Sequence, residues 1–168
     1  MVSIAVVGPP MSGKTHLCVM LAGLPTTSRS VYNETCGVHY LKSDIDSVPW
    51  HIWDTPSYTS TGWPGAHTAS EAQVVVVCHD GRRLENPCEI VRKLGVDKCI
   101  IALTCTPLAS TDLSYAMDYL STTTRYGGLV PVVLAVHTVG RLISAIQSVA
   151  SRLQVDSATP VEYGTQFG

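Results

Sequence analysis

Residues 8–15 read GPPMSGKT and match the pattern GxxxxGK[ST]. The apolar run Val2–Val7 precedes them and the helical pattern of Leu17–Leu24 follows, so the match lies between a strand and a helix. In such a loop, successive backbone N–H groups surround phosphate groups, and the helix N-terminus adds partial positive charge. The sequence therefore predicts a nucleotide-phosphate site formed by Met11, Ser12, Gly13, Lys14, Thr15 and His16.

Two residues of this stretch carry specific chemistry, and two others limit it. Lys14 is expected to reach the terminal phosphates, and the Thr15 hydroxyl to ligate Mg²⁺. Pro9 and Pro10 have no N–H group, so the phosphate donors begin only at Met11.

Two polar residues further along complete the predicted magnesium site. Asp54 directly follows the apolar run Trp50–Trp53, which is the position of a Walker-B acid. Thr35 lies in a polar segment, residues 26–37, long enough to fold over a γ-phosphate and offer a hydroxyl to the same ion. The predicted metal ligands are Thr15, Thr35 and Asp54.

Short apolar runs alternate with helical segments along the chain, which indicates an α/β fold with buried parallel strands. Such sheets bind ligands at the carboxyl ends of their strands. The runs are Val2–Val7, Trp50–Trp53, Val74–Val77, Cys99–Leu103 and Val130–Val136.

Three helices can be placed between and after these runs. Asn86 and Pro87 are typical of a helix start, and Gly95 of its end. Two later stripes repeat at helical spacing and predict core-facing sides. They are Leu113, Ala116, Met117 and Leu120, and then Leu142, Ile146, Val149 and Leu153.

Composition limits the possible partners. The chain has 168 residues, enough for one domain with its own core, and a formal charge of −2, so we expect no binding to nucleic acid. No apolar stretch is long enough to span a membrane, and the chain ends without a cysteine for prenylation, so we expect no membrane anchor. Six cysteines without metal-site spacing indicate free thiols in a reducing compartment.

The chain resembles the Ras-like small GTPases in three segments: residues 8–15, the switch-like Tyr32–Thr35, and Trp53–Pro56. It is similar more narrowly to the Rab-like-five branch, a subunit of intraflagellar transport complex B. That similarity lies in Cys36–Val38 and in Trp63-Pro64 spaced ahead of residues 74–80.

This resemblance implies a small-GTPase (P-loop) fold with a six-stranded, mostly parallel sheet flanked by helices. It also implies GTP or GDP with Mg²⁺ as cofactors, coiled-coil subunits of intraflagellar transport complex B as partners, and a location in the cytoplasm and the cilium or flagellum. The domain is expected to span residues 1–155, followed by a C-terminal tail at 156–168.

Two positions depart from the family where hydrolysis is concerned. Small GTPases normally carry a Gly that senses the γ-phosphate and then a Gln that orients the attacking water. Here those positions hold Ser57 and Tyr58. Because a tyrosine cannot polarise water as an amide does, we expect slow or undetectable hydrolysis.

The guanine-reading motif is also altered. The family reads guanine with Asn-Lys-x-Asp after the fifth strand, whereas residues 104–107 are Thr-Cys-Thr-Pro. Without a carboxylate that accepts two bonds from the base, we expect nucleotide affinity to fall toward micromolar and selectivity for guanine to decrease. ATP is therefore an alternative ligand. The resemblance still assigns the nucleotide contacts at the last two strand ends to Thr104, Cys105, His137 and Thr138.

The roles of two surface features, and two alternative functions, are not decided by the sequence. Trp63 is either a lid over the core or a partner anchor, and Tyr115, Tyr119 and Tyr126 are expected on the solvent side of their helix, as a docking face. The alternatives to a nucleotide-dependent docking module are an active enzyme, either a GTPase or a small P-loop kinase, and a structural subunit with constitutively bound nucleotide.

Overall fold

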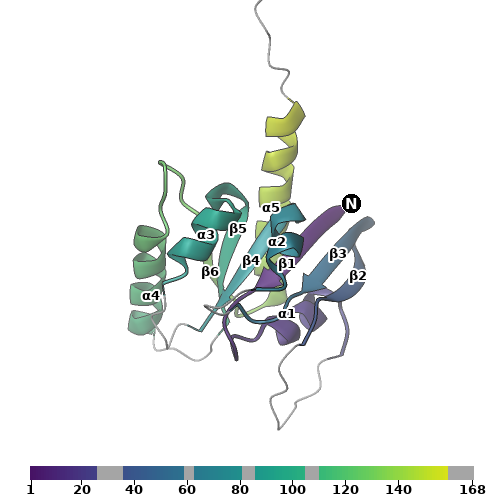
Figure 1. Cartoon of the computed structure of the whole chain (residues 1–168), viewed down its shortest axis with the longest axis horizontal. Helices are drawn as coiled ribbons and strands as arrows, with labels where there is room; N and C mark the ends of the chain where they lie inside the picture. The colour runs from purple at the N-terminus through teal and green to yellow at the C-terminus, as the bar shows by residue number, and fades with distance from the viewer. Residues whose placement is uncertain (26–35, 59–62, 81–85, 105–109, 159–168) are drawn as a thin grey trace, which may run out of the picture.

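The protein forms a sheet covered by helices on both faces (Figure 1). The computed structural model describes residues 1–25, 36–58, 63–80, 86–104 and 110–158. Within these ranges the sheet has six strands in the order β2-β3-β1-β4-β5-β6. Only β2 is antiparallel to its neighbour, so the predicted six-stranded, mostly parallel sheet is confirmed. The strands are β1 (Val2–Val7), β2 (His39–Ile45), β3 (Val48–Asp54), β4 (Val74–His79), β5 (Cys99–Leu103) and β6 (Val132–Ala135).

The helices divide between the two faces of the sheet. Residues of α1 and α5 join one buried cluster with alternate residues of the central strands, and residues of α2, α3 and α4 join a second cluster with the others. This is the division expected of right-handed crossovers between parallel strands. The helices are α1 (Lys14–Leu21), α2 (Ala66–Glu71), α3 (Cys88–Leu94), α4 (Ser110–Thr123) and α5 (Val139–Ala158), with a 3₁₀ turn, η1 (Val96–Lys98).

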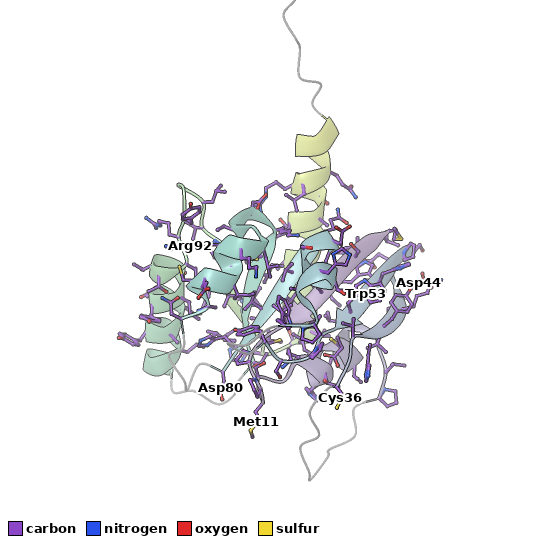
Figure 2. All side chains as sticks on the ribbon, viewed as in Figure 1. Met11, Cys36, Asp44, Trp53, Asp80 and Arg92 are labelled. Carbon is purple, nitrogen blue, oxygen red and sulfur yellow. The ribbon has the colours of Figure 1, made fainter. Side chains whose placement is uncertain are left out.

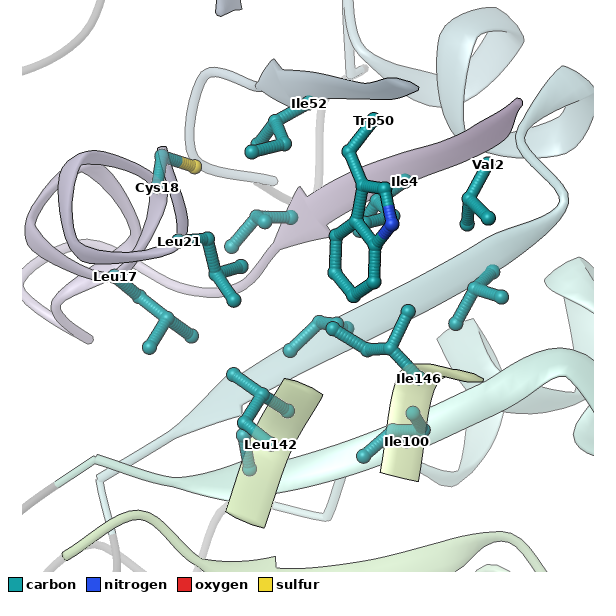
Figure 3. Packing of buried hydrophobic residues seen from close by; sticks show 14 of the residues in the cluster. Val2, Ile4, Leu17, Cys18, Leu21, Trp50, Ile52, Ile100, Leu142 and Ile146 are labelled. Atoms are coloured by element: carbon teal, nitrogen blue, oxygen red, sulfur yellow. The ribbon is translucent and has the colours of Figure 1, made fainter. Parts of the chain in front are cut away.

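Trp50 is the largest side chain of the first cluster. It is 0% exposed and lies among Val2, Ile4 and Ile146 (Figure 3). Its strand, β3, is not at the edge of the sheet, because β2 pairs with it on the outer side. The indole nitrogen of Trp50 is buried without a hydrogen-bond partner in the described part of the chain, so its hydrophobic contacts outweigh an unmade bond.

The strand β2 was missed in the sequence. It pairs with β3 across the two-residue turn Asp46–Ser47, where both φ angles are positive (51° and 62°). Two positive φ angles are typical of a type I′ hairpin turn, but Asp-Ser is a rarer choice there than Asn-Gly. Exposed and half-buried residues alternate from Tyr40 to Ile45. In the sequence, the signal for this strand is the even spacing of Leu41 and Ile45 among polar residues.

Several predicted ends move by a few residues. The helix expected at Leu17–Leu24 is α1, which begins at Lys14, inside the motif. The run Val130–Val136 shortens to β6, because Pro131 has no N–H for a ladder and residues 126–129 close a turn before it. The last helix, α5, ends at Ala158, and residues 159–168 lie outside the described ranges.

Both helical stripes face the core as predicted. Ala116 and Leu120 of α4 are buried, as are Leu142, Ile146 and Val149 of α5. At α3, the Asn86 side chain accepts a 2.9 Å hydrogen bond from the Cys88 amide. The helix begins at Cys88 with Pro87 at its N-cap position, so the start predicted from Asn86 and Pro87 is displaced by one residue.

Gly8, the first residue of the motif, offers a test of the packing beneath it. A Cβ atom there would lie 2.6 Å from Ser12 Oγ and 2.7 Å from the Cys78 carbonyl oxygen of β4. Because that carbonyl belongs to a buried strand, Gly8→Ala should lower the free energy of unfolding by about 1–3 kcal/mol in urea titrations followed by circular dichroism. The matched control is Gly140→Ala on α5, where nothing lies within 4 Å. It should be neutral or stabilise by up to about 1 kcal/mol, and equal effects of the two changes would contradict this packing.

Candidate functional site

The motif forms a loop between the end of β1 and the start of α1, with backbone angles suited to anion binding. Met11 (φ 60°) and Gly13 (φ 82°) are left-handed, and Gly13 caps α1 without a side-chain bond. Alternating right- and left-handed residues turn successive N–H groups toward one side, and the first four N–H groups of a helix have no acceptor within it. A positive φ at a non-glycine residue costs about 1–3 kcal/mol and is typical of functional loops. Figure 2 shows Met11 and Asp80 at the same lower edge of the molecule.

Lys14 is held beneath this loop with its ammonium group inside the protein. The residue is 5% exposed, and Nζ donates to the Pro9 carbonyl oxygen at 2.8 Å and to Ser57 Oγ at 3.0 Å. Both of these acceptors are uncharged. A phosphate oxygen reaching Lys14 would therefore form a stronger, charge-assisted bond than either of them.

Thr15 and Asp54 meet beside the lysine, at the ends of α1 and β3. Thr15 Oγ1 donates to Asp54 Oδ2 at 2.7 Å. The second carboxyl oxygen, Oδ1, is buried without a hydrogen-bond partner among the described residues. Burial raises the pKa of Asp54, while the Thr15 bond and the Lys14 charge oppose that shift.

This geometry fits a magnesium ion. A hydroxyl and a carboxylate are the hard oxygen ligands that Mg²⁺ takes from proteins next to phosphates. Oδ1 of Asp54 has no hydrogen-bond partner among the described residues, although the Cys18 thiol lies close enough to the carboxyl group to lower its pKa. A nearby cation would stabilise the charged form that burial disfavours. Thr15 and Asp54 are thus brought together as predicted, whereas Thr35 lies outside the described residues.

Thr104 stabilises the loop through hydrogen bonds to two backbone carbonyl oxygens. Its Oγ1 donates to the Ser12 carbonyl oxygen at 2.6 Å, and its amide donates to the His79 carbonyl oxygen at 3.1 Å. The sequence predicted a nucleotide contact for Thr104, and the structure places it against the loop with its hydroxyl engaged by Ser12. No pattern in the sequence signalled this supporting role, because a lone threonine after a strand has no distinctive neighbours.

The segment after Asp54 lies against the loop on the other side. The Thr55 amide and Oγ1 both donate to the Val6 carbonyl oxygen, at 3.3 and 2.8 Å, and the Tyr58 amide donates to the Gly8 carbonyl oxygen at 3.4 Å. Ser57 lies beside Lys14, a contact that the sequence does not predict. A serine at this position gives no signal of its own.

Trp63 closes this segment. Its Nε1 donates to the Pro56 carbonyl oxygen at 3.0 Å, and its ring meets Tyr58 edge-on at 6.0 Å between centroids. The side chain is half-buried and packs against the second core cluster. Of the two roles left open for Trp63, these contacts favour the lid.

The remaining predicted contacts lie near the same end of the sheet. His16 is exposed in the first turn of α1, and His137 and Thr138 are exposed after β6. The Val136 amide donates to the Leu103 carbonyl oxygen at 2.9 Å, which places the last two strand ends side by side. Cys105 lies outside the described residues.

The described part of the chain shows neither a metal-binding cluster nor a reactive cysteine among the thiols considered below. No group of three His, Cys, Asp and Glu side chains lies together there, so Cys36 and His39 do not belong to a metal cluster. The cysteines it contains are free thiols, and burial raises the pKa of both Cys78 and Cys99 to about 12, which leaves them protonated and unreactive. None of the described helices is long and apolar enough to cross a membrane.

Comparisons with known proteins identify the fold. No family model and no curated protein sequence matches the chain. A bacterial selenocysteine-specific elongation factor is similar in structure, with a TM-score of 0.73, 14% identity, and coverage of 95% of this chain and 29% of that one. This chain therefore spans less than a third of the elongation factor.

Two further structures are similar over more of their own length. Toc33 from Arabidopsis thaliana, solved with GDP and Mg²⁺, gives a TM-score of 0.66 at 15% identity over 90% of this chain and 84% of that one. A complex of SsGBP with GDP gives 0.65 at 21% identity over 91% and 51%. At these identities the likeness establishes the architecture alone, and the chain has the small-GTPase P-loop fold.

Proposed function

We propose that the chain binds GTP or GDP together with Mg²⁺ at the loop of residues 8–15. The observation that carries this proposal is the meeting of three groups at the carboxyl ends of β1 and β3. They are the buried ammonium of Lys14, the Thr15 hydroxyl and the unpartnered Oδ1 of Asp54. Lys14 and the amides from Met11 to His16 bind the phosphates, and Thr15 and Asp54 hold the ion. When bound, Mg²⁺ would neutralise phosphate charge at this site.

Base recognition is proposed to be weak. The Thr104 hydroxyl is already bonded to Ser12, and residues 104–107 contain no carboxylate to accept two bonds from guanine. The guanine preference is therefore proposed from the family resemblance. GDP-bound neighbours of the same fold are compatible with it.

The biological role proposed is that of a Rab-like subunit of intraflagellar transport complex B. In this role the chain docks on coiled-coil partner subunits in the assembly of the cilium or flagellum. Support comes from the motif resemblance and from an aromatic surface on α4. Tyr115 is 61% exposed there, and its ring stacks on Tyr119 at 6.5 Å. Exposed tyrosines are enriched where proteins dock.

The predicted tyrosine face needs one correction. Tyr126 is exposed but lies beyond the end of α4, in the turn of residues 126–129, where Arg92 sits 5.0 Å above its ring. Tyr119 is half-buried and packs partly on the core. The exposed aromatic surface of the helix itself is therefore centred on Tyr115.

Calorimetric titration with GTP, GDP and ATP tests the nucleotide site. With Mg²⁺ we expect micromolar binding of GDP and GTP and a small preference over ATP. Lys14→Ala should weaken all three by about 10- to 100-fold, because a charge-assisted phosphate contact is lost. Lys42→Ala, which removes an exposed lysine of β2, is the matched control and should leave binding unchanged. No Mg²⁺-dependent binding of any of the three at millimolar concentration would refute the proposal.

Single-turnover hydrolysis separates a binding module from an active GTPase. Unassisted small GTPases hydrolyse GTP at a rate on the order of 10⁻⁴ s⁻¹. The wild-type chain should be slower, because the Tyr58 side chain has no amide group to orient water. The Lys14→Ala protein corrects for contaminating activity, and a rate as fast as an ordinary small GTPase would favour the enzyme.

Substitution of Tyr115 tests the docking surface. Tyr115→Ala and Tyr119→Ala should weaken capture by the coiled-coil subunits of intraflagellar transport complex B by more than about 10-fold if this face carries a hot spot. Tyr40→Ala, an exposed tyrosine on β2 at the other edge of the sheet, is the control. Unchanged capture by both α4 variants would remove this surface. Equal capture with GTP, GDP and no nucleotide would favour a structural subunit.

A further inference from the structure

The Ser57 hydroxyl is buried beside Lys14, where it accepts one hydrogen bond and donates none to the described residues. The residue is 6% exposed, and its Oγ accepts the 3.0 Å bond from Lys14 Nζ. A serine hydroxyl also has one hydrogen to donate, and within the described ranges no acceptor for that hydrogen is found. Buried donors are rarely left unbonded, since an unmade bond is costly. This hydroxyl is therefore suited to an acceptor that arrives from outside the chain.

The position of Ser57 is fixed before any ligand binds. On one side Thr55 is bonded twice to the Val6 carbonyl oxygen, and on the other the Tyr58 amide is bonded to Gly8. Trp63 holds the intervening Pro56 carbonyl oxygen. A donor held in this way loses little conformational freedom when it binds, so most of its bond energy is retained as affinity.

The surroundings of Ser57 indicate which group it meets. Lys14 Nζ lies 3.0 Å away, and a lysine at this position of the motif reaches the β- and γ-phosphates. Ser57 follows β3 and Asp54, so it belongs to the metal side of the site and not to the loop of residues 8–15. One phosphoryl group carries several oxygens, so one can accept from Lys14 while another accepts from Ser57.

We infer that Ser57 Oγ–H donates to the terminal phosphate of a nucleoside triphosphate and makes this chain discriminate triphosphate from diphosphate. The inference rests on the proposed nucleotide site and adds a side-chain contact where the resembling family carries a glycine. A diphosphate lacks this terminal phosphate, so it would leave the hydroxyl without its acceptor.

The test compares binding of the nonhydrolysable analogue GppNHp with binding of GDP, both with Mg²⁺, by calorimetry. Ser57→Ala should weaken GppNHp by about 10- to 100-fold and GDP by no more than about 3-fold, because only one charge-assisted bond is removed. Ser57→Gly, which also lacks the hydroxyl, should behave in the same way, and Ser57→Thr should keep the wild-type ratio. Ser114→Ala, an exposed serine of α4, is the matched control.

The outcomes separate this inference from the function on which it rests. Equal weakening of both nucleotides would mean that Ser57 acts only by positioning Lys14, and it would overturn the inference while the nucleotide site stands. Unchanged or tighter GppNHp binding would overturn it as well, since water or nothing would then satisfy the hydroxyl. Failure of the wild-type chain to bind either nucleotide would instead refute the site itself. Thermal melts show which variants are folded, and either hydroxyl-free variant suffices.

Discussion

The hydrogen bonds that hold the carbonyl oxygens of the motif loop are the constraint on which the site depends. The Gly8 carbonyl accepts from the Tyr58 amide, the Pro9 carbonyl from Lys14 and Ser12, and the Ser12 carbonyl from Thr104. Because the N–H and C=O of a planar trans peptide point in opposite directions, fixing a carbonyl inward turns the next N–H outward. The two prolines occupy the first two of these peptides, so the donors offered to a ligand begin later in the loop, as their lack of N–H requires.

The groups that bond to these carbonyl oxygens come from different elements of the fold. Tyr58 follows β3, Thr104 follows β5, and Lys14 belongs to the first turn of α1. The parallel sheet brings them together because the carboxyl ends of its strands meet at one edge. The loop is thus assembled by the whole sheet, which explains why a left-handed Met11 and a buried, unpartnered oxygen of Asp54 persist there. Both features cost stability in the folded chain, and the proposed binding of phosphate and a cation would offset that cost.

Much of this architecture could be predicted from the sequence, since strong local patterns decide it. The motif between a strand and a helix, and the buried apolar runs, predicted the five parallel strands β1, β3, β4, β5 and β6 and the pairing of Thr15 with Asp54. The hairpin strand β2 escaped because it is half-exposed and turns at Asp46–Ser47 without glycine. The contacts of Thr104 with Ser12 and of Ser57 with Lys14 were not predicted, for another reason. Their contacts join residues 92 and 43 positions apart, and neither residue type announces such a partner.

Hydrogen exchange of the loop amides tests whether they bind the phosphates of a nucleotide. Deuterium uptake should be followed by mass spectrometry in peptides covering residues 8–18, with and without saturating Mg²⁺ and GDP. If the amides from Met11 to His16 bind the phosphates, their exchange should slow in the presence of the ligand, while peptides from α4 change little. Saturating binding, established by titration, without any slowing in this loop would show that the nucleotide lies elsewhere and would contradict the account.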